Sequence, residues 1–228
     1  MRDILLMGAA RERSTRIKNK IMRTFGYTTL FELYLRKLET INKDKNPFNN
    51  VILALNKEDK KLCELAKKYN VKVQERNSFS VGKATMPKDI YHFLENYDDD
   101  YVMWINACFP FLKIETVIKA ANYFVKHNEI NSLHCVKKRQ NWFWNPKTNR
   151  PFNLEKTSDA TTQQSLPVYE SVHCFHIHNI KDLLEKNIYW SFKKNDPYLY
   201  SVEETVECID IDNPFEFELA EVLWKYYK

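Results

Sequence analysis

Glycine is scarce in this sequence. Only three glycines occur in 228 residues, at Gly8, Gly26 and Gly82, whereas average usage would give about 16. Glycine-rich phosphate loops need at least two glycines at close spacing, because the backbone must approach the phosphates. The sequence therefore excludes a P-loop and a G-x-G-x-x-G dinucleotide fingerprint, and any phosphate-binding site must be built from side chains.

Cysteine pairs and long apolar runs are also missing. The five cysteines contain no C-x-x-C pair, and an odd number of them, partly within apolar runs, favours reduced thiols in the core. No apolar stretch approaches the roughly 20 residues that a membrane-spanning helix needs. The early charges at the N-terminus do not fit a signal peptide. We therefore expect a cytoplasmic protein without a membrane partner.

The residues that are present are those of an ordinary globular protein. Of the 228 residues, 44% are hydrophobic, 14% aromatic and 29% charged, a balance that excludes a disordered or fibrous chain. The length suits one α/β domain with its own core, and we expect a single domain over residues 1–228. The net charge of +5 suits either a polyanion or a small anionic substrate as a partner.

Short β-rich runs alternate with amphipathic segments along the chain. The runs VILAL and YVMWIN are almost wholly apolar, which is typical of strands covered on both faces in a mostly parallel sheet. We therefore predict a Rossmann-like three-layer α/β/α sandwich. Its expected strands are 3–7, 51–55, 71–74, 101–106, 132–136, 172–177 and 206–211. Its expected helices are 28–42, 59–69, 87–96, 114–127, 180–186 and a last one that begins at Pro214.

The alternation stops at residue 137. From there to residue 171, polar, aromatic and turn residues mix without a helical or strand period, which indicates a segment outside the main core. We predict that residues 137–171 form an inserted arm or lid.

A cluster of basic and hydroxyl side chains follows the first predicted strand. Ligands of open α/β sheets bind at the carboxyl ends of strands, and guanidinium groups bind phosphate oxygens in pairs. The loop therefore has the composition and the place of a triphosphate site without glycine. The alternative is a basic loop that only faces solvent. The side chains are Arg11, Arg13, Ser14, Thr15, Arg16, Lys18 and Lys20.

Two carboxylates, Asp210 and Asp212, lie two residues apart at the end of the last predicted strand. Residues i and i+2 of an extended strand point to the same face, so both carboxylates can reach one cation. Mg²⁺ typically takes one or two carboxylates together with substrate phosphates and water. The sequence thus predicts a Mg²⁺ site, and the alternative is a helix N-cap at Asp212 or Asn213.

Both clusters resemble motifs of one family. The loop resembles the nucleotide-binding motif A-R-x-x-S-x-R-x-x-x-K of the cytidylyltransferases that make CMP-activated acidic sugars, the CMP-sialate and CMP-Kdo synthetases. The segment 209–221, IDIDNPFEFELAE, is similar to a signature of the same family. Segments 105–111 and 164–169 and Arg76 are similar to further family positions, so the resemblance covers nearly the whole chain. The matching loop positions are Ala10, Arg11, Ser14, Arg16 and Lys20.

The resemblance implies a fold of the nucleotide-diphospho-sugar transferase type and transfer of CMP from CTP. An acceptor oxygen would attack the α-phosphorus in line, and pyrophosphate would leave. The resemblance further implies that Arg76 and Asn106 contact the cytidine, that Asp210 and Asp212 hold Mg²⁺, and that the arm reaches across a homodimer. The phosphates would be held by Arg11, Ser14, Arg16 and Lys20 beside Ala10, with Arg11, Lys20 and the two carboxylates as the catalytic groups.

The acceptor side departs from the family pattern. Cys108 and Phe109 stand where the family has a Thr-Ser pair, Gln163 stands in place of an arginine, and His173-Cys174 stands in place of Asn-Gly. The acceptor is therefore left open between a nonulosonic or keto-sugar acid and a phosphonate or phosphate monoester. The residues expected on the acceptor side are Gln164, Tyr169 and His176, with a cation from Lys137, Lys138 or Arg139.

Three further patterns indicate other functions. His176 and His178 share a strand face at a spacing that suits zinc, and the alternative is a pair of histidines that line the acceptor pocket. The aromatic run 142–144 in the basic arm suits stacking of single-stranded nucleic acid, and the alternative is burial in a subunit interface. The aspartates at 98–100 resemble the D-x-D motif of nucleotide-sugar glycosyltransferases, and the alternative is a solvated turn. The two rival functions are thus a glycosyltransferase and a basic nucleic-acid-binding protein without catalysis, and we do not expect a nucleic-acid partner.

Overall fold

A mixed β-sheet forms the centre of the protein, which we describe from a computed structural model. The structure describes residues 2–12, 14, 16–43, 46–156 and 161–227. Within them, seven strands pair in the order β11-β7-β10-β6-β1-β4-β5. All neighbouring strands are parallel except β10, which is antiparallel to both β6 and β7. The strands are β1 (Ile4–Ala9), β4 (Phe48–Asn56), β5 (Lys72–Arg76), β6 (Tyr101–Asn106), β7 (Leu133–Arg139), β10 (Val168–Asn179) and β11 (Tyr198–Ser201).

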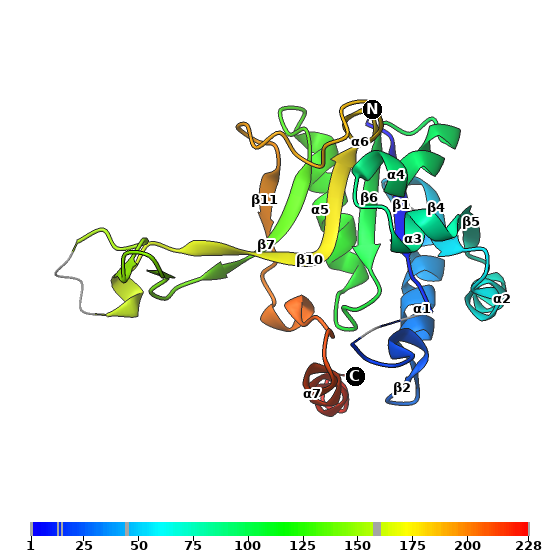
Figure 1. The fold of residues 1–228 in the computed structure, drawn as a ribbon, viewed down its shortest axis with the longest axis horizontal. Coiled ribbons are helices and arrows are strands. Elements are labelled where there is room, and N and C mark those ends of the chain that lie inside the picture. Colours follow the sequence, from blue (N-terminus) through cyan, green and yellow to red (C-terminus); the bar gives the residue numbers. More distant parts are fainter. Residues whose placement is uncertain (1, 13, 15, 44–45, 157–160, 228) are drawn as a thin grey trace.

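Helices cover both faces of this sheet (Figure 1). Because successive strand residues point to opposite faces, Leu6 of β1 packs into one core layer and Leu5 into the other. The first layer contains α1 (Leu30–Lys43), α2 (Lys60–Lys68) and α5 (Ile114–Lys126). The second contains α4 (Pro87–Tyr91), the 3-10 helix η2 (His92–Asn96) and α6 (Ile180–Leu184), with α3 (Ser78–Gly82) beside α4. The predicted three-layer α/β/α architecture is therefore confirmed.

The last helix, α7 (Pro214–Trp224), lies at the end of the sheet where β1 and β6 finish (Figure 1). Phe217 and Ala220 of α7 pack with Ile17 and Phe25 from the segment after β1. That segment contains the 3-10 turn η1 (Lys20–Met22) and a small hairpin of β2 (Thr24–Phe25) and β3 (Thr28–Thr29). The N-terminal loop and the C-terminal helix thus share a small core. No helix among the described residues is long and apolar enough to cross a membrane.

One predicted strand is wrong. Residues 206–211 form no strand, because the 3-10 turn η4 (Thr205–Cys208) brings Glu207 under the start of α5. Its carboxylate accepts hydrogen bonds from the backbone N–H of Lys113 at 2.8 Å and from the hydroxyl of Thr116 at 3.0 Å. The strand at this edge of the sheet, next to β7, is instead β11, which the sequence did not predict. The helix expected over 28–42 begins at Leu30, since Thr28 and Thr29 pair in the hairpin.

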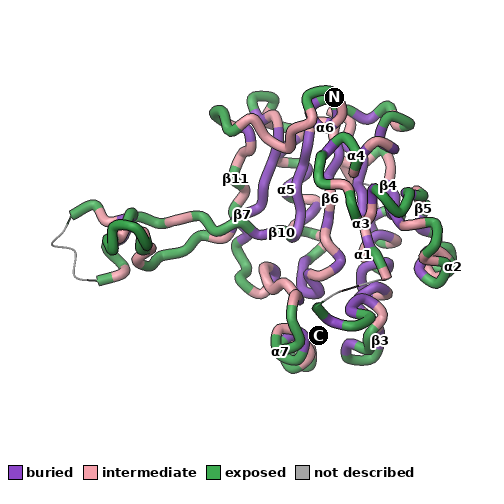
Figure 2. The backbone as a smooth tube through the Cα atoms, in the orientation of Figure 1, coloured by how far each residue is buried: buried purple, intermediate pink, exposed green. Residues whose placement is uncertain are grey.

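The segment from 137 to 171 projects from the sheet as a long arm (Figure 1). Its base is a continuation of β7 and β10, in which Tyr169 pairs with Lys138. Farther out lie β8 (Trp144–Asn145), β9 (Arg150–Pro151) and the 3-10 turn η3 (Thr162–Gln164). Asn153 is buried there, and its side chain donates to the carbonyls of Asn141 and Leu166, both at 2.7 Å. Most other residues of the arm are exposed (Figure 2).

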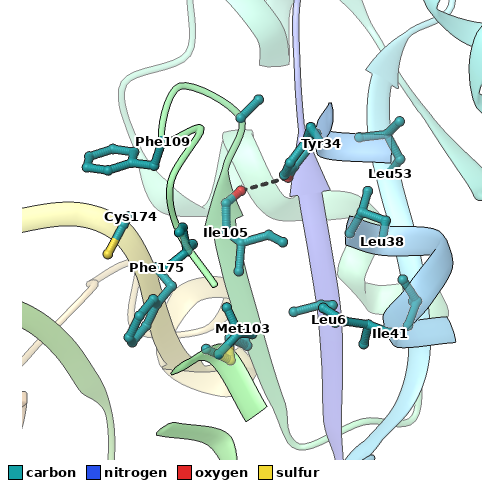
Figure 3. Close-up of a cluster of buried hydrophobic side chains, with 14 of the residues drawn as sticks. Leu6, Tyr34, Leu38, Ile41, Leu53, Met103, Ile105, Phe109, Cys174 and Phe175 are labelled. Atoms are coloured by element: carbon teal, nitrogen blue, oxygen red, sulfur yellow. Dashed lines mark hydrogen bonds between the residues drawn. The ribbon is translucent and has the colours of Figure 1, made fainter. Parts of the chain in front are cut away.

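A glycine in β1 lets a tyrosine of α1 pass against the sheet. Gly8 faces Tyr34, whose hydroxyl donates a 2.8 Å hydrogen bond to the carbonyl of Ile105 in β6 (Figure 3). A Cβ atom at position 8 would lie 2.5 Å from the Tyr34 oxygen and 3.1 Å from Cδ1 of Leu38. The bond ties α1 to the end of β6, from which the following turn begins.

Replacing Gly8 with alanine is therefore expected to destabilise the protein. The new methyl displaces the buried Tyr34 hydroxyl, so we expect urea unfolding to show a loss of about 1–3 kcal/mol. The same replacement in a Tyr34→Phe background should cost less, because the oxygen nearest to the new methyl is gone. An equal cost in both backgrounds would contradict this explanation.

Candidate functional site

One cavity lies at the carboxyl ends of β1, β5 and β6. It encloses about 370 Å³, at the edge of the sheet where open α/β folds bind their ligands. Loop residues after β1, the last residue of β5, the turn after β6 and one residue before α7 all contribute to its wall. The predicted site residues among them are Ala10, Arg11, Ser14, Arg16, Lys20, Arg76, Asn106 and Asp212. Arg13 and Thr15 of the same loop lie outside the described residues.

The charge of the wall favours an anionic ligand. Four cationic side chains and a single carboxylate, Asp212, line the cavity in the described part of the chain. Arginine and lysine side chains around a partly enclosed space bind phosphate or carboxylate groups by charge-assisted hydrogen bonds. The loop that the sequence placed after the first strand is therefore part of a shared cavity wall and not only a solvent-facing segment.

Arg76 is a buried cation at the back of the cavity. Its side chain ends β5, only 8% of the residue is exposed, and its Nε has no hydrogen-bond partner among the described residues. Burial lowers the pKa of Arg76, and the nearby charge of Arg11 acts in the same direction. A buried polar atom without a partner is costly, so Arg76 is suited to a ligand that accepts hydrogen bonds.

Lys20 and Arg16 connect the N-terminal loop to the residues before α7. The Lys20 ammonium donates to the carbonyl of Ile211 at 2.6 Å and lies 3.4 Å from Oδ1 of Asp212. Arg16 Nη1 lies 2.8 Å from Oδ2 of the same carboxylate. These contacts join residues that are more than 190 positions apart and hold both cations at the cavity.

The start of α7 fixes the position of Asp212. Asn213 is the N-cap, since its side chain accepts a hydrogen bond from the backbone of Glu216 at 3.0 Å. Glu216 in turn accepts from the backbone N–H groups of Asp212 at 2.7 Å and Asn213 at 3.0 Å. This reciprocal capping leaves the Asp212 carboxylate free of the helix, so that it faces Arg16 and Lys20.

Asp210 lies beside this group in an irregular segment. The prediction that it stands at the end of a strand is therefore wrong. Its Oδ1 is buried and has no hydrogen-bond partner among the described residues. Burial and the neighbouring charge of Asp212 raise the pKa of Asp210 to about 6, against an opposing effect of Lys20. An unsatisfied carboxylate oxygen next to a second carboxylate fits a hard cation such as Mg²⁺. The described residues offer no cluster of three or more metal-binding side chains, so the other ligands would have to come from substrate and water.

The turn after β6 is held from two sides. Asn106 accepts a hydrogen bond from the backbone of Cys108 at 3.0 Å and donates to the carbonyl of His173 at 3.1 Å. Lys37 of α1 donates hydrogen bonds to the carbonyls of Phe109 and Pro110 at 3.1 and 2.8 Å. Burial lowers the pKa of Lys37 to about 7. The sequence reading missed Lys37. Its place one turn after Tyr34, near the apolar face of the helix, was the available signal.

The other predicted site residues lie elsewhere. Gln164 lies in η3 of the arm, and Tyr169 is exposed in the arm part of β10. His176 is buried behind Trp104, a cavity residue that the sequence reading also missed, with the two rings stacked at 5.4 Å. Their contact with an acceptor therefore stays a prediction.

The three aspartates at 98–100 lie at the amino ends of the strands, opposite the cavity. They precede β6, and the backbone of Asp100 donates to the carbonyl of Asp3 at 3.1 Å, before β1. Asp99 is buried and accepts a 2.9 Å hydrogen bond from Asn50, so a fully solvated turn is not correct either. This position removes the sequence argument for a glycosyltransferase, because the acids are far from the cavity.

Comparison with known proteins found a matching family model and one relative that matches about half of the chain. A family model described as cytidylyltransferase matches residues 9–225. An uncharacterised protein of Methanocaldococcus jannaschii is 27% identical over 121 residues, and the match spans 52% of this chain and 46% of that protein, so less than half of the relative's length is covered.

Solved structures share the fold. A CMP-2-keto-3-deoxy-manno-octonic acid synthetase complexed with CTP superimposes with a TM-score of 0.70 at 8% identity, covering all of both chains. The 4-diphosphocytidyl-2C-methyl-D-erythritol synthase of Anaerococcus prevotii gives 0.65 at 14% identity, covering 98% of this chain and 99% of that one. A cytidylyltransferase of Leptospira borgpetersenii gives 0.61 at 17% identity, covering 99% and 87%.

Proposed function

The chain belongs to the cytidylyltransferase family, and on this basis we propose that it transfers CMP from CTP to a small anionic acceptor with release of pyrophosphate. The observation that carries the proposal is the cavity at the carboxyl ends of β1, β5 and β6, which among the described residues is lined by four cationic side chains and one carboxylate. A solved structure with the same fold was determined in complex with CTP.

We assign different residues of the cavity to the phosphates and to the base. Arg11, Arg16 and Lys20 bind the triphosphate, with Ser14 as a hydroxyl donor, because guanidinium and ammonium groups donate to several phosphate oxygens at once. Arg76, whose buried Nε has no partner among the described residues, donates to the acceptor atoms of cytosine. Asn106 already uses one amide hydrogen and its oxygen within the protein, which leaves it a second amide hydrogen for the nucleotide.

Asp210 and Asp212 are the residues that would hold Mg²⁺. When bound, the ion would neutralise charge on the phosphates and help to orient them. The two carboxylates belong to the segment that Lys20 ties to the N-terminal loop. Their positions relative to the cationic side chains are therefore fixed.

The chain's own residues contribute alignment and charge to the reaction. The acceptor oxygen attacks the α-phosphorus, and the bond from phosphorus to the bridging oxygen of the β-phosphate breaks. Arg11, Arg16 and Lys20 stabilise the negative charge that grows on the leaving pyrophosphate. Holding both reactants in line supplies the other main part of the rate enhancement.

The acceptor is a nonulosonic or keto-sugar acid, or a phosphonate or phosphate monoester. Arg139 is paired with Glu170 at 2.6 Å, so Lys137 and Lys138 at the base of the arm are the better candidates for its anionic group. The arm also exposes large apolar side chains, among them Trp144 and Phe152. We propose that a second copy of the chain covers them in a homodimer, which would bring Gln164 and Tyr169 to the partner's cavity.

Thermal unfolding with each nucleotide tests the proposal without knowledge of the acceptor. We expect CTP with Mg²⁺ to stabilise the protein more than UTP, ATP or GTP, by about 2.7 kcal/mol at a concentration 100 times its Kd. Arg76→Met should remove most of the preference for CTP, because it removes the buried donor. Arg36→Met, an exposed arginine on α1 outside the cavity, is the matched control.

The outcomes separate the alternatives. A shift with CTP alone justifies screening sugar acids and phosphate monoesters for pyrophosphate release. No shift with any nucleotide would remove the main support for the proposal. Binding of oligonucleotides that falls steeply with salt would favour the nucleic-acid-binding alternative instead.

A further inference from the structure

Three histidines and a serine form a continuous chain of hydrogen bonds beside the cavity. Nδ1 of His134 in β7 lies 2.8 Å from Nδ1 of His176 in β10. Nε2 of His176 lies 3.2 Å from Nδ1 of His173, and Nε2 of His134 lies 2.9 Å from the hydroxyl of Ser171. The order of the chain is therefore His173, His176, His134, Ser171.

A strand irregularity makes the chain possible. Residues three apart in a regular strand point to opposite faces, so His173 and His176 would not meet. The register between β10 and β7 shifts between Ser171 and His176, and such irregularities re-aim side chains. The HCFHIH run of the sequence shows the histidines, but the shift that brings their rings together depends on the pairing of the strands.

The two central rings of this hydrogen-bond chain, His134 and His176, are enclosed and uncharged. His134 and His176 are 4% and 5% exposed, with Trp104 stacked on His176 and Trp190 against His134 at 4.8 Å. Burial lowers the pKa of His134 to about 4 and that of His176 well below its ordinary value. Both rings are therefore neutral at neutral pH, and each has one N–H donor and one acceptor nitrogen.

When each of the three rings carries a single N–H, the hydrogen bonds of the chain can point in only two directions. In the first, Nδ1–H of His173 donates to His176, Nδ1–H of His176 donates to His134, and Nε2–H of His134 donates to Ser171. The outer Nε2 of His173 is then an acceptor. In the second, every bond is reversed and this nitrogen carries a hydrogen. A proton that arrives at His173 converts the first arrangement into the second and releases a proton at Ser171.

One end of the hydrogen-bond chain lies next to a residue of the cavity wall, and both ends are exposed. Asn106 of the cavity wall donates to the backbone carbonyl of His173, and Trp104 both lines the cavity and stacks on His176. Among the described residues, no group bonds to the outer Nε2 of His173, and that residue is exposed. Ser171 is exposed at the base of the arm. The hydrogen-bond chain thus runs from His173, next to the cavity residue Asn106, through two buried rings to the exposed Ser171.

We propose that His173, His176, His134 and Ser171 form a proton relay that carries away the proton of an acceptor hydroxyl during cytidylyl transfer. The proposal rests on the function proposed above and applies to its sugar-acid acceptors, whose attacking oxygen is a hydroxyl. The acceptor O–H bond breaks and its proton goes to Nε2 of His173, while the oxygen forms a bond to the α-phosphorus and pyrophosphate leaves with the electrons of the broken P–O bond. One proton moves across each hydrogen bond, and one leaves from Ser171 to solvent. His173 is the group that touches the substrate, and the other three act through it.

A zinc site at these histidines does not fit the geometry. The ring nitrogens face one another in pairs within hydrogen-bond distance, so their lone pairs do not converge on a common point. Where the structure describes the chain, no group of three metal-binding side chains is arranged to hold an ion. The earlier zinc interpretation of His176 and His178 therefore gains no support.

Long-range ¹H–¹⁵N correlation spectra of the full chain with ¹⁵N-labelled histidine rings test the relay. The spectra report which nitrogen of each ring carries hydrogen. At neutral pH we expect Nδ1–H at His173 and His176 and Nε2–H at His134, with His134 and His176 uncharged. His92 and His127, which are not part of the hydrogen-bond chain, serve as references. An imidazolium at His134 or His176, or an Nε2–H form of His173 in the resting protein, would overturn the proposal.

Two matched variants separate a relay from simple packing. His134→Phe keeps a ring in place but removes the acceptor of the His176 Nδ1–H, so both His176 and His173 should change to their Nε2–H forms. His178→Phe alters a ring 5.8 Å from His176 that is not in the chain, and it should leave His173 unchanged. If His173 responds to neither variant or equally to both, the relay is wrong. Stabilisation by CTP, measured on the same samples, reports on the proposed function independently of the tautomers.

Discussion

Lys20→Gln is expected to lower kcat/KM for CTP by about 10²–10³-fold, the effect of losing one donor to a charge that develops in the transition state. The Lys20 ammonium is 2.6 Å from the carbonyl of Ile211 and lies at the cavity beside Asp212. Only 7% of the residue is exposed, so water does not screen its charge strongly. Glutamine keeps a hydrogen-bond donor toward Ile211 but carries no charge toward the phosphates.

Pyrophosphate release with the acceptor found by screening gives the rate, and thermal unfolding with CTP gives an acceptor-free measure of the same loss. Lys18→Gln is the control, since Lys18 is exposed in the same loop and is not part of the cavity wall. If both variants lose activity equally, general attraction by the basic loop explains the result and the specific place of Lys20 does not.

Asp210→Asn is expected to abolish metal-dependent turnover and yet leave the unliganded protein as stable as before, or more stable. Its carboxylate is partly buried, has an unsatisfied oxygen and lies near Asp212, and these conditions raise its pKa to about 6. Because the folded state disfavours the ionised form, a neutral amide relieves that penalty at neutral pH. If Asp210 holds Mg²⁺, the variant loses the stabilisation of the transition state by the ion, which is several kcal/mol. This loss corresponds to at least about 10²-fold in rate.

Asp212→Asn provides the contrast within the same segment. This carboxylate pairs with Arg16 at 2.8 Å and with Lys20 at 3.4 Å, so its loss leaves two cations without their partner. We expect lower stability as well as lower activity, measured by thermal unfolding without divalent metal and by pyrophosphate release. Asp98→Asn, at the far edge of the sheet, should change neither by much. A fall in stability for Asp210→Asn as large as that for Asp212→Asn would contradict the assignment of Asp210 as a carboxylate held ready for a cation.

The layers of the fold and the position of the basic loop after β1 follow from the sequence alone. The apolar runs in β4 and β6 are covered on both faces in the structure, because such runs have no polar side to give to solvent. The scarcity of glycine required a site made of side chains, and the loop after β1 supplies Arg11, Arg16 and Lys20 to one cavity. These features depend on local composition and order, which a single sequence shows directly.

Tertiary structure decided the features that depend on distant partners. The strand expected at 206–211 is absent because Glu207 binds the start of α5, and β11 joins the edge of the sheet instead. The sequence also did not show that Nε of Arg76 is buried without a partner among the described residues, that Lys20 binds Ile211, or that a register shift joins His173 to His176. Local periodicity reports only which way a side chain faces, whereas burial, pairing and strand register arise when separate segments pack together.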